Sequence, residues 1–185
     1  MLMRRNPKDT VAGFTIAEGL VVMVMAGILA AIAGPSWLGF LDRRRVSSAQ
    51  DQALQAMRSA QAKAIRQKQT WEAGFKQEGD RLKWSVHLPS NTPVWQDLIE
   101  GDSDKVKLHS SDLGGPCTDT EHCVRFQSRG VLDDDWLAGK NAGDSIAQIT
   151  FTTANGKEPR CVIVATLLGS LRTGRSVEDG CAAPD

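Results

Sequence analysis

The chain has 185 residues, of which 24% are charged and 41% are hydrophobic. This composition is typical of a globular protein and excludes a wholly disordered chain. The formal net charge is zero, with 22 basic and 22 acidic residues. Residues 1–13 contain three basic residues and one acidic residue, so their removal would leave 19 basic and 21 acidic groups. This balance excludes a globally basic nucleic-acid binder and leaves room only for a local basic patch.

An uncharged apolar segment runs from Gly19 to Leu41, directly after Glu18. As a helix, its 23 residues would extend about 34 Å, enough to cross the hydrocarbon core of a bilayer. A cleavable secretory signal peptide would have a shorter apolar stretch followed by a small-residue cleavage site, whereas this segment continues into Asp42 and three arginines. The sequence therefore predicts a membrane-spanning helix. Basic residues flank it on both sides and leave its orientation undetermined.

All four cysteines follow this segment: Cys117, Cys123, Cys161 and Cys181. An even number of cysteines on one side of an apolar segment suits two disulfides in an oxidising compartment, so we expect the C-terminal part to be extracytoplasmic. Three pairings are possible, and the proximity of the first two cysteines favours 117–123, with 161–181 as its complement. A zinc site is the alternative, but the chain lacks a C-x-x-C pair, and only His122 stands near a cysteine.

The N-terminal string Gly13-Phe14-Thr15-Ile16-Ala17-Glu18 lies between a short basic leader and the apolar segment. It resembles the type IV prepilin signature. The resemblance implies cleavage between Gly13 and Phe14 by prepilin peptidase and methylation of Phe14. It also implies that Glu18 sets the register of a filament by pairing with the α-amino group of the neighbouring subunit's Phe14. Gly27 and Pro35 stand where pilins often carry a glycine and a helix-loosening proline.

Residues 46–70 continue the helical pattern with an apolar stripe at three- and four-residue spacing, which predicts packing on a sheet. The members of the stripe are Ala49, Ala53, Leu54, Met57, Ala60, Ala64 and Ile65. The basic side chains of this segment are expected to be solvated: Arg58, Lys63, Arg66 and Lys68. The segment from Ala53 to Arg66 is similar to the helix of the GspH/FimT group of minor pseudopilins.

After Thr70 the pattern predicts strands. Residues 71–77 and 82–88 should form a hairpin, with further strands at 105–109, 123–127, 145–152 and 160–167. Alternation in residues 83–88 predicts a half-buried strand. The two late strands also resemble the GspH/FimT group. We therefore expect an α+β fold, in which a long N-terminal helix packs on a mainly antiparallel sheet. The expected divisions are a leader (1–13), a transmembrane or filament-core helix (14–41), its amphipathic continuation (42–70) and a β-rich domain (71–185).

No residue pattern indicates catalysis or a cofactor. His87, His109 and His122 lack metal-ligand spacing, and we expect them in ordinary surface or half-buried positions. Residues 133–135 are three successive aspartates without the spacing of a calcium loop, which indicates a solvated acidic turn. There is no nucleophile elbow and no phosphate-binding glycine loop. The sequence therefore favours a protein that is not an enzyme.

Arg172 and Arg175 form a basic cluster among the glycines of the C-terminal tail. Some FimT-type minor pilins carry a glycine-arginine motif in this region that contacts DNA during uptake. Flexible arginines of this kind can reach phosphates. Against DNA contact, Ser170 stands where the first arginine of that motif would be, and acidic residues follow at 178 and 179.

The resemblance implies a non-catalytic minor pilin or pseudopilin of a type IV pilus or type II secretion system. Its partners would be prepilin peptidase, other pilins of the filament, an inner-membrane assembly platform and membrane lipid. It would reside in the inner membrane as a single-pass precursor and then in the filament. Two alternatives stay open. One is a DNA-binding minor pilin, and the other is a single-pass membrane protein that carries an extracytoplasmic binding domain.

Overall fold

The computed structural model describes residues 13–99, 101, 103–138, 146–178 and 181, without the side chains of residues 33–36, 38, 103 and 110. The expected leader therefore lies outside the described residues, apart from Gly13. The chain divides into two units, Met1–Phe40 and Leu41–Asp185. The helix α1 (Ile16–Gln67) contributes to both and continues through position 35, so no interruption occurs at the proline.

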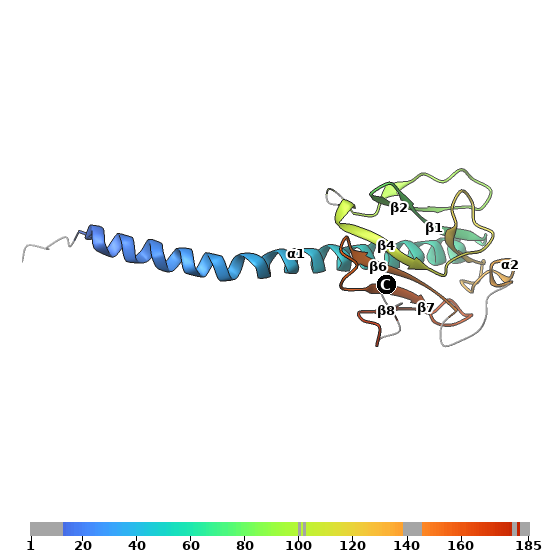
Figure 1. The fold of residues 1–185 in the computed structure, drawn as a ribbon. Helices are drawn as coiled ribbons and strands as arrows, with labels where there is room; N and C mark the ends of the chain where they lie inside the picture. Colours follow the sequence, from blue (N-terminus) through green and yellow to red (C-terminus); the bar gives the residue numbers. More distant parts are fainter. Residues whose placement is uncertain (1–12, 100, 102, 139–145, 179–180, 182–185) are drawn as a thin grey trace, which may run out of the picture. The chain divides into compact units, whose positions relative to one another are not determined.

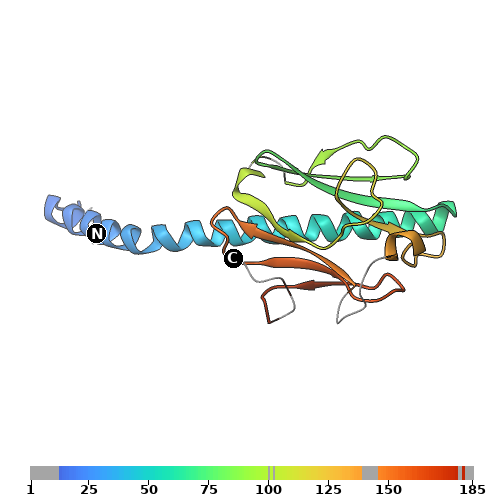
Figure 2. The ribbon, with the colours of Figure 1, turned by 45° about the vertical axis from the view of Figure 1, so that its right-hand side comes forward.

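Figures 1 and 2 show α1 lying against the β-sheets within the second unit. The helix buries a narrow stripe of mostly small side chains. The stripe has the predicted three- and four-residue spacing, but its membership differs from the prediction. Leu54 is only half-buried and Ile65 is 43% exposed, whereas Val46 and Ala56 are buried. Alanines allow the helix backbone to approach the sheets closely. The buried members are Val46, Ala49, Ala53, Ala56, Met57, Ala60 and Ala64.

The first sheet has the strand order β3-β2-β1-β5, and all neighbours are antiparallel. Its strands are β1 (Trp71–Glu78), β2 (Arg81–His87), β3 (Gln96–Asp97) and β5 (His122–Phe126). The predicted hairpin is confirmed: β1 and β2 pair from Glu72↔His87 to Glu78↔Arg81. Gly79 has a φ of 63° at the first central position of the turn, where a two-residue hairpin loop favours glycine.

The second sheet has the order β4-β6-β7-β8, also antiparallel. A 3₁₀ turn, η1 (Ser103–Lys105), leads into β4 (Val106–Ser111). The other strands are β6 (Ala147–Thr153), β7 (Arg160–Val164) and β8 (Leu171–Gly174). Apolar residues of both sheets and of α1 form one buried cluster, which includes Phe75, Phe126, Ile149 and Phe151. The predicted α+β class is thus confirmed, with two sheets in place of one.

Four short elements were not predicted: β3, η1, β8 and α2 (Asp134–Leu137). The prediction of a solvated acidic turn at residues 133–135 is correct for the exposure of Asp134 and Asp135, but these residues begin a helix rather than a turn. Asp133 is the N-cap of α2, because its side chain accepts a hydrogen bond from the backbone N–H of Trp136 at 3.2 Å. Trp136 is fully buried, and its indole Nε1 donates to the carbonyl of Cys123 at 2.8 Å. The three aspartates therefore begin a short helix, and this helix places Trp136 in the core.

Burial along β2 also differs from the simple expectation for an alternating strand. Ser85 and His87 are 3% and 7% exposed, whereas Trp84 and Val86 are only half-buried. The reason is that Ser85 and His87 lie on the polar face of the first sheet, and the segment before β5 and Trp95 cover that face. A Cβ added at Gly74 would lie 3.1 Å from Thr120 Cγ2 and 3.3 Å from Trp95. Both faces of the sheet are therefore buried around β1.

Candidate functional site

The segment that carries the prepilin-like string lies at the start of α1. Thr15 immediately precedes the helix, and its Oγ1 accepts a hydrogen bond from the backbone N–H of Glu18 at 3.2 Å. The carbonyl of Thr15 accepts from the N–H of Gly19 at 3.1 Å. The four residues Thr15-Ile16-Ala17-Glu18 have the form of a capping box, and an acid in the first turn is favoured by the helix dipole. Glu18 therefore has a local role in starting the helix, which the sequence interpretation did not consider.

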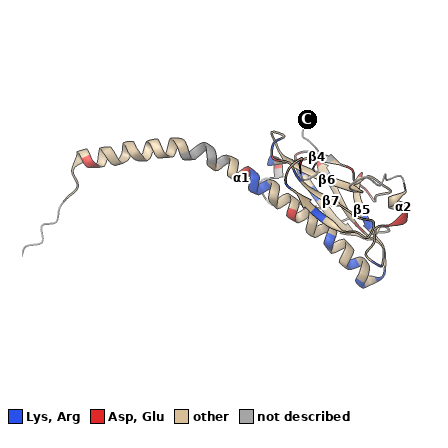
Figure 3. Ribbon diagram, turned by 90° about the horizontal axis from the view of Figure 1, so that it is seen from below, with Lys and Arg blue, Asp and Glu red and all other residues tan. Residues whose placement is uncertain are grey.

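The described side chains after this start are apolar and exposed. Phe14 is 84% exposed, Ile16 is 93% exposed, and the large apolar residues between Leu20 and Ile32 are 51–78% exposed. Figure 3 shows no charged residue on the described part of α1 between the acidic position near its start and the charged group that begins at Asp42. Within the part of the chain that the structure describes, no helix is long and apolar enough to cross a membrane.

Both expected disulfides are present. Cys117 and Cys123 are joined across a six-residue separation, and Cys161 and Cys181 across twenty. The first bridge ties the loop before β5 to that strand. The second ties the segment after β8 to β7. Cys123, Cys161 and Cys181 are buried, so these bridges belong to the folded interior rather than to the surface.

A buried polar network lies next to the first bridge. Glu72 on β1 is fully buried, and its Oε2 accepts from Arg125 Nε at 2.8 Å. Its Oε1 accepts from the backbone N–H of Thr118 at 2.9 Å and lies 3.6 Å from His87 Nε2. The three side chains of Arg125, Glu72 and His87 form a row, because they are paired across β5, β1 and β2. Burial lowers the pKa of His87, against the opposing effect of Glu72.

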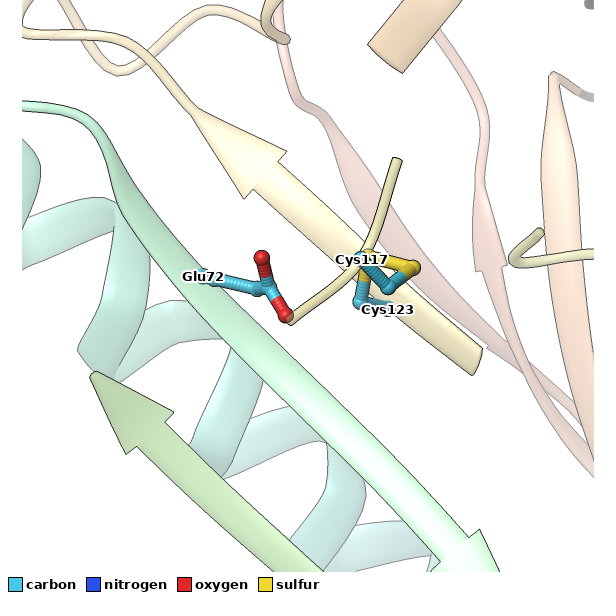
Figure 4. Close-up of side chains that lie close together, drawn as sticks. All are labelled: Glu72, Cys117 and Cys123. Carbon is cyan, nitrogen blue, oxygen red and sulfur yellow. A yellow bond between two sulfur atoms is a disulfide. The ribbon is translucent and has the colours of Figure 1, made fainter. Parts of the chain in front are cut away.

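The only arrangement among the described residues that resembles a metal-ligand set is Glu72 with Cys117 and Cys123, whose ligand atoms lie within 4.8 Å of one another. Figure 4 shows why it does not provide a thiolate site: the two sulfurs are bonded to each other. Zinc requires deprotonated cysteine sulfur. In this form the group is a disulfide packed beside a carboxylate, and the zinc interpretation of the cysteines does not fit.

The three histidines are dispersed. His87 is buried, which contradicts the surface or half-buried position expected for it, whereas His109 and His122 are half-buried as expected. Burial also lowers the pKa of His122. The histidines lie on β2, β4 and β5 and do not converge on one site.

Arg172 and Arg175 are both exposed, but the expected flexible tail is wrong for Arg172. It lies on β8, the edge strand of the second sheet, and is paired with Ile163 of β7. Arg175 follows directly after Gly174, the last residue of β8. Arg175 therefore lies in a bend outside the strand, and strand pairing positions only Arg172.

Among models of known protein families, one matches residues 49–168, that of the type II transport protein GspH. The chain belongs to the GspH family. GspH proteins are pseudopilins of the type IV pilin-like family, which is structural rather than catalytic. No curated protein and no solved structure gives a significant match.

The GspH match extends from Ala49 in α1 to Leu168 after β7. It therefore includes the buried row of Arg125, Glu72 and His87 and the first disulfide, which sequence analysis missed as a connected group. The sequence signal available was Glu72, an acidic residue among the apolar and small residues at the start of a predicted strand. The match does not include the prepilin-like string or the arginines of β8. The roles suggested for those residues rest on the string and on the exposure of the arginines.

Proposed function

We propose that this GspH-family chain is a non-catalytic pseudopilin subunit of a type II secretion pseudopilus, made as a precursor and cut by prepilin peptidase between Gly13 and Phe14. Phe14 then becomes the N-terminal residue and is methylated. The observation that carries the proposal is the exposed apolar surface of residues 19–32, directly after the prepilin-like string. Such a surface is unfavourable in water and is stable only when lipid or other apolar helices cover it.

Residues 14–41 serve first as the inner-membrane anchor and then as the part of the filament core that this subunit contributes. Support comes from the uncharged run Gly19–Leu41 in the sequence. The amphipathic continuation (42–70) and the β-rich domain (71–185) are extracytoplasmic, which agrees with two disulfides in that part of the chain.

Glu18 sets the axial register between subunits. A carboxylate among apolar helices is costly unless it is paired, and the new α-amino group of the neighbouring subunit's Phe14 supplies a positive charge for it. The further partners are the other pseudopilins, the inner-membrane assembly platform and membrane lipid. The alternative in which the chain is a simple single-pass anchored domain gives Glu18 only its role at the helix start.

The first test is the intact mass of the full chain, extracted from membranes with and without active prepilin peptidase. We expect loss of residues 1–13 and one added methyl group only when the peptidase is active. Gly13→Val should abolish processing. Gly19→Val, a matched change within the same N-terminal segment, should not. An unprocessed chain beside active peptidase would exclude the proposal and leave the single-pass anchored domain.

DNA contact is a second candidate function, favoured by the exposure of Arg172 and Arg175 at the edge of the second sheet. Phosphate contacts of this kind weaken steeply with salt. The test is binding of the detergent-solubilised chain to duplex DNA at two salt concentrations. Arg172→Ala/Arg175→Ala should weaken binding, whereas Arg81→Ala, an exposed arginine on β2, should not. Equal binding by both variants would exclude the contact.

A further inference from the structure

A hollow of about 300 Å³ lies beside the first sheet. Its lining comes from three parts of the second unit. Ser59 and Lys63 belong to α1, and Trp71 begins β1. Residues 84–88 come from β2 and its end, and the segment that follows contributes Asn91, Thr92, Val94 and Gln96. Val94 is 75% exposed at its border.

The edge of β2 is incompletely covered at this hollow. β3 pairs with β2 only at Lys83↔Asp97 and Trp84↔Gln96. The carbonyl of Leu82 accepts from the N–H of Leu98 at 2.7 Å, so the backbone groups of Leu82 point away from β1. Because alternate residues of a strand direct their backbone groups to the same edge, those of Val86 also point outward.

Val86 lies beyond the last residue of β2 that pairs with β3, so β3 does not cover this part of the edge. Among the described residues, no backbone hydrogen bond joins Val86 to the segment 88–95; the nearest backbone bond of that segment links Asn91 N–H to the carbonyl of Leu88. An uncovered strand edge beside a hollow is the geometry in which proteins accept an additional strand.

The lining also has a definite charge and hydrogen-bonding character. Lys63 is the one charged residue among its lining residues, and no carboxylate lines the hollow. Lys63 Nζ lies 4.7 Å from the centre of the Trp71 ring, so this lysine is half-buried and not solvated as predicted. In the described structure, Trp71 Nε1 is buried without a hydrogen-bond partner. A buried donor of this kind is unfavourable, so a ligand that brings an acceptor is favoured beside Trp71. The His87 ring points to the opposite face of the sheet, toward Glu72, and plays no part here.

We propose that this hollow binds an extended acidic segment of a partner protein, which adds a strand to β2 at Val86 and places a carboxylate beside Lys63 and Trp71. The backbone of the segment supplies hydrogen bonds to the strand edge, and the carboxylate provides the charge that the lining lacks. A hollow of this size accommodates one or two side chains of such a segment. The site does not depend on cleavage at Gly13, so its test is separate from that of the proposed function.

The test measures binding of a fluorescent peptide, Thr-Val-Asp-Val-Thr with blocked ends, to the full chain in detergent. We expect Lys63→Gln to weaken binding at least fivefold. The matched control is Lys76→Gln, because Lys76 Nζ lies 4.5 Å from the Trp95 ring in an equivalent pair outside the hollow. It should leave binding unchanged. A peptide with Asn in place of Asp should bind the unsubstituted chain at least fivefold more weakly.

Strand addition is tested separately from charge. Val86→Pro removes the outward N–H at an edge position that tolerates proline. If that variant does not fold, a peptide with N-methylated backbone amides makes the same test on the unsubstituted chain and should bind at least tenfold more weakly. The proposal is overturned if Lys63→Gln and Lys76→Gln bind equally, if N-methylation has no effect, or if no binding occurs at millimolar peptide. Self-association that Lys63→Gln abolishes would assign the hollow to a second copy of the chain and would also overturn it.

Discussion

Arg125 Nε donates a hydrogen bond of 2.8 Å to Oε2 of Glu72, a side chain with no exposed surface. Glu72 lies on β1, between β2 and β5, and its other oxygen accepts from the Thr118 N–H beside the first disulfide. The pair therefore connects the middle of the first sheet to the loop that Cys117–Cys123 closes. A buried carboxylate is tolerated when it is paired and hydrogen-bonded, as it is here.

Removal of the cation from this pair should be strongly destabilising. Arg125→Met leaves Glu72 buried without its charge partner, and we expect the free energy of unfolding to fall by about 3–5 kcal/mol. Urea unfolding of the detergent-solubilised chain measures it. Glu72→Met/Arg125→Met should recover most of the loss, because no buried charge remains. The control Arg81→Gln breaks an exposed 3.7 Å ion pair with Asp97 and should change stability by at most about 0.5 kcal/mol. Equal effects of Arg125→Met and Arg81→Gln would contradict the role given to the pair.

Stability should decrease as the pH falls below about 6.5, the ordinary pKa of histidine. Burial lowers the pKa of His87 and of His122 in the folded chain. The unfolded chain therefore binds protons first as the pH falls, and stability is lost between 6.5 and the lower folded pKa values. Unfolding measured at pH 7 and pH 5 gives the size of the loss.

His87→Gln should reduce this pH dependence, and His87→Gln/His122→Gln should reduce it further, because the two shifts have the same direction. Glu72, Arg125 and Asp119 also act on His87, and their own charges are retained in both variants. If the double variant lost as much stability between pH 7 and pH 5 as the unsubstituted chain, the buried histidines would not be the source.

Gly115→Ala should destabilise the loop before β5. A Cβ at this position would lie 2.7 Å from Cδ1 and 2.9 Å from Nε1 of Trp136, a fully buried ring that cannot move aside freely. We expect a loss of about 1–3 kcal/mol from this overpacking. Gly114→Ala is the matched control, since its nearest contact would be 3.9 Å from the carbonyl of Glu121. Equal thermal midpoints for the two variants would show that the ring yields to the added methyl group.

The two disulfides should differ in their contribution to stability. The chain-entropy model gives about 2 kcal/mol for the short 117–123 loop and about 3 kcal/mol for the longer 161–181 loop. We therefore expect Cys161→Ala/Cys181→Ala to cost more than Cys117→Ala/Cys123→Ala in urea unfolding. The opposite order would indicate that the first bridge acts mainly by holding Thr118 against Glu72 rather than through loop closure.

Several features of the fold follow directly from local sequence. Alanines at three- and four-residue spacing predict the buried stripe of α1, and the turn at Gly79 predicts the β1–β2 hairpin. The presence of two disulfides could also be inferred, because four cysteines all follow the apolar segment. These inferences succeed because helix faces, hairpins and composition depend on residues that are near one another in the chain.

Other features required the tertiary structure. The chain alone determined that a long helix with an apolar beginning precedes a disulfide-bonded β-rich part, because periodicity and composition encode it locally. Only the fold decided that there are two sheets, that Arg172 lies on an edge strand, and that the hollow beside Val86 is left open. It also decided that Glu72 meets Arg125, 53 residues away, beside His87. Strand pairing over such separations depends on the packing of the whole sheet, so no local pattern of residues specifies it.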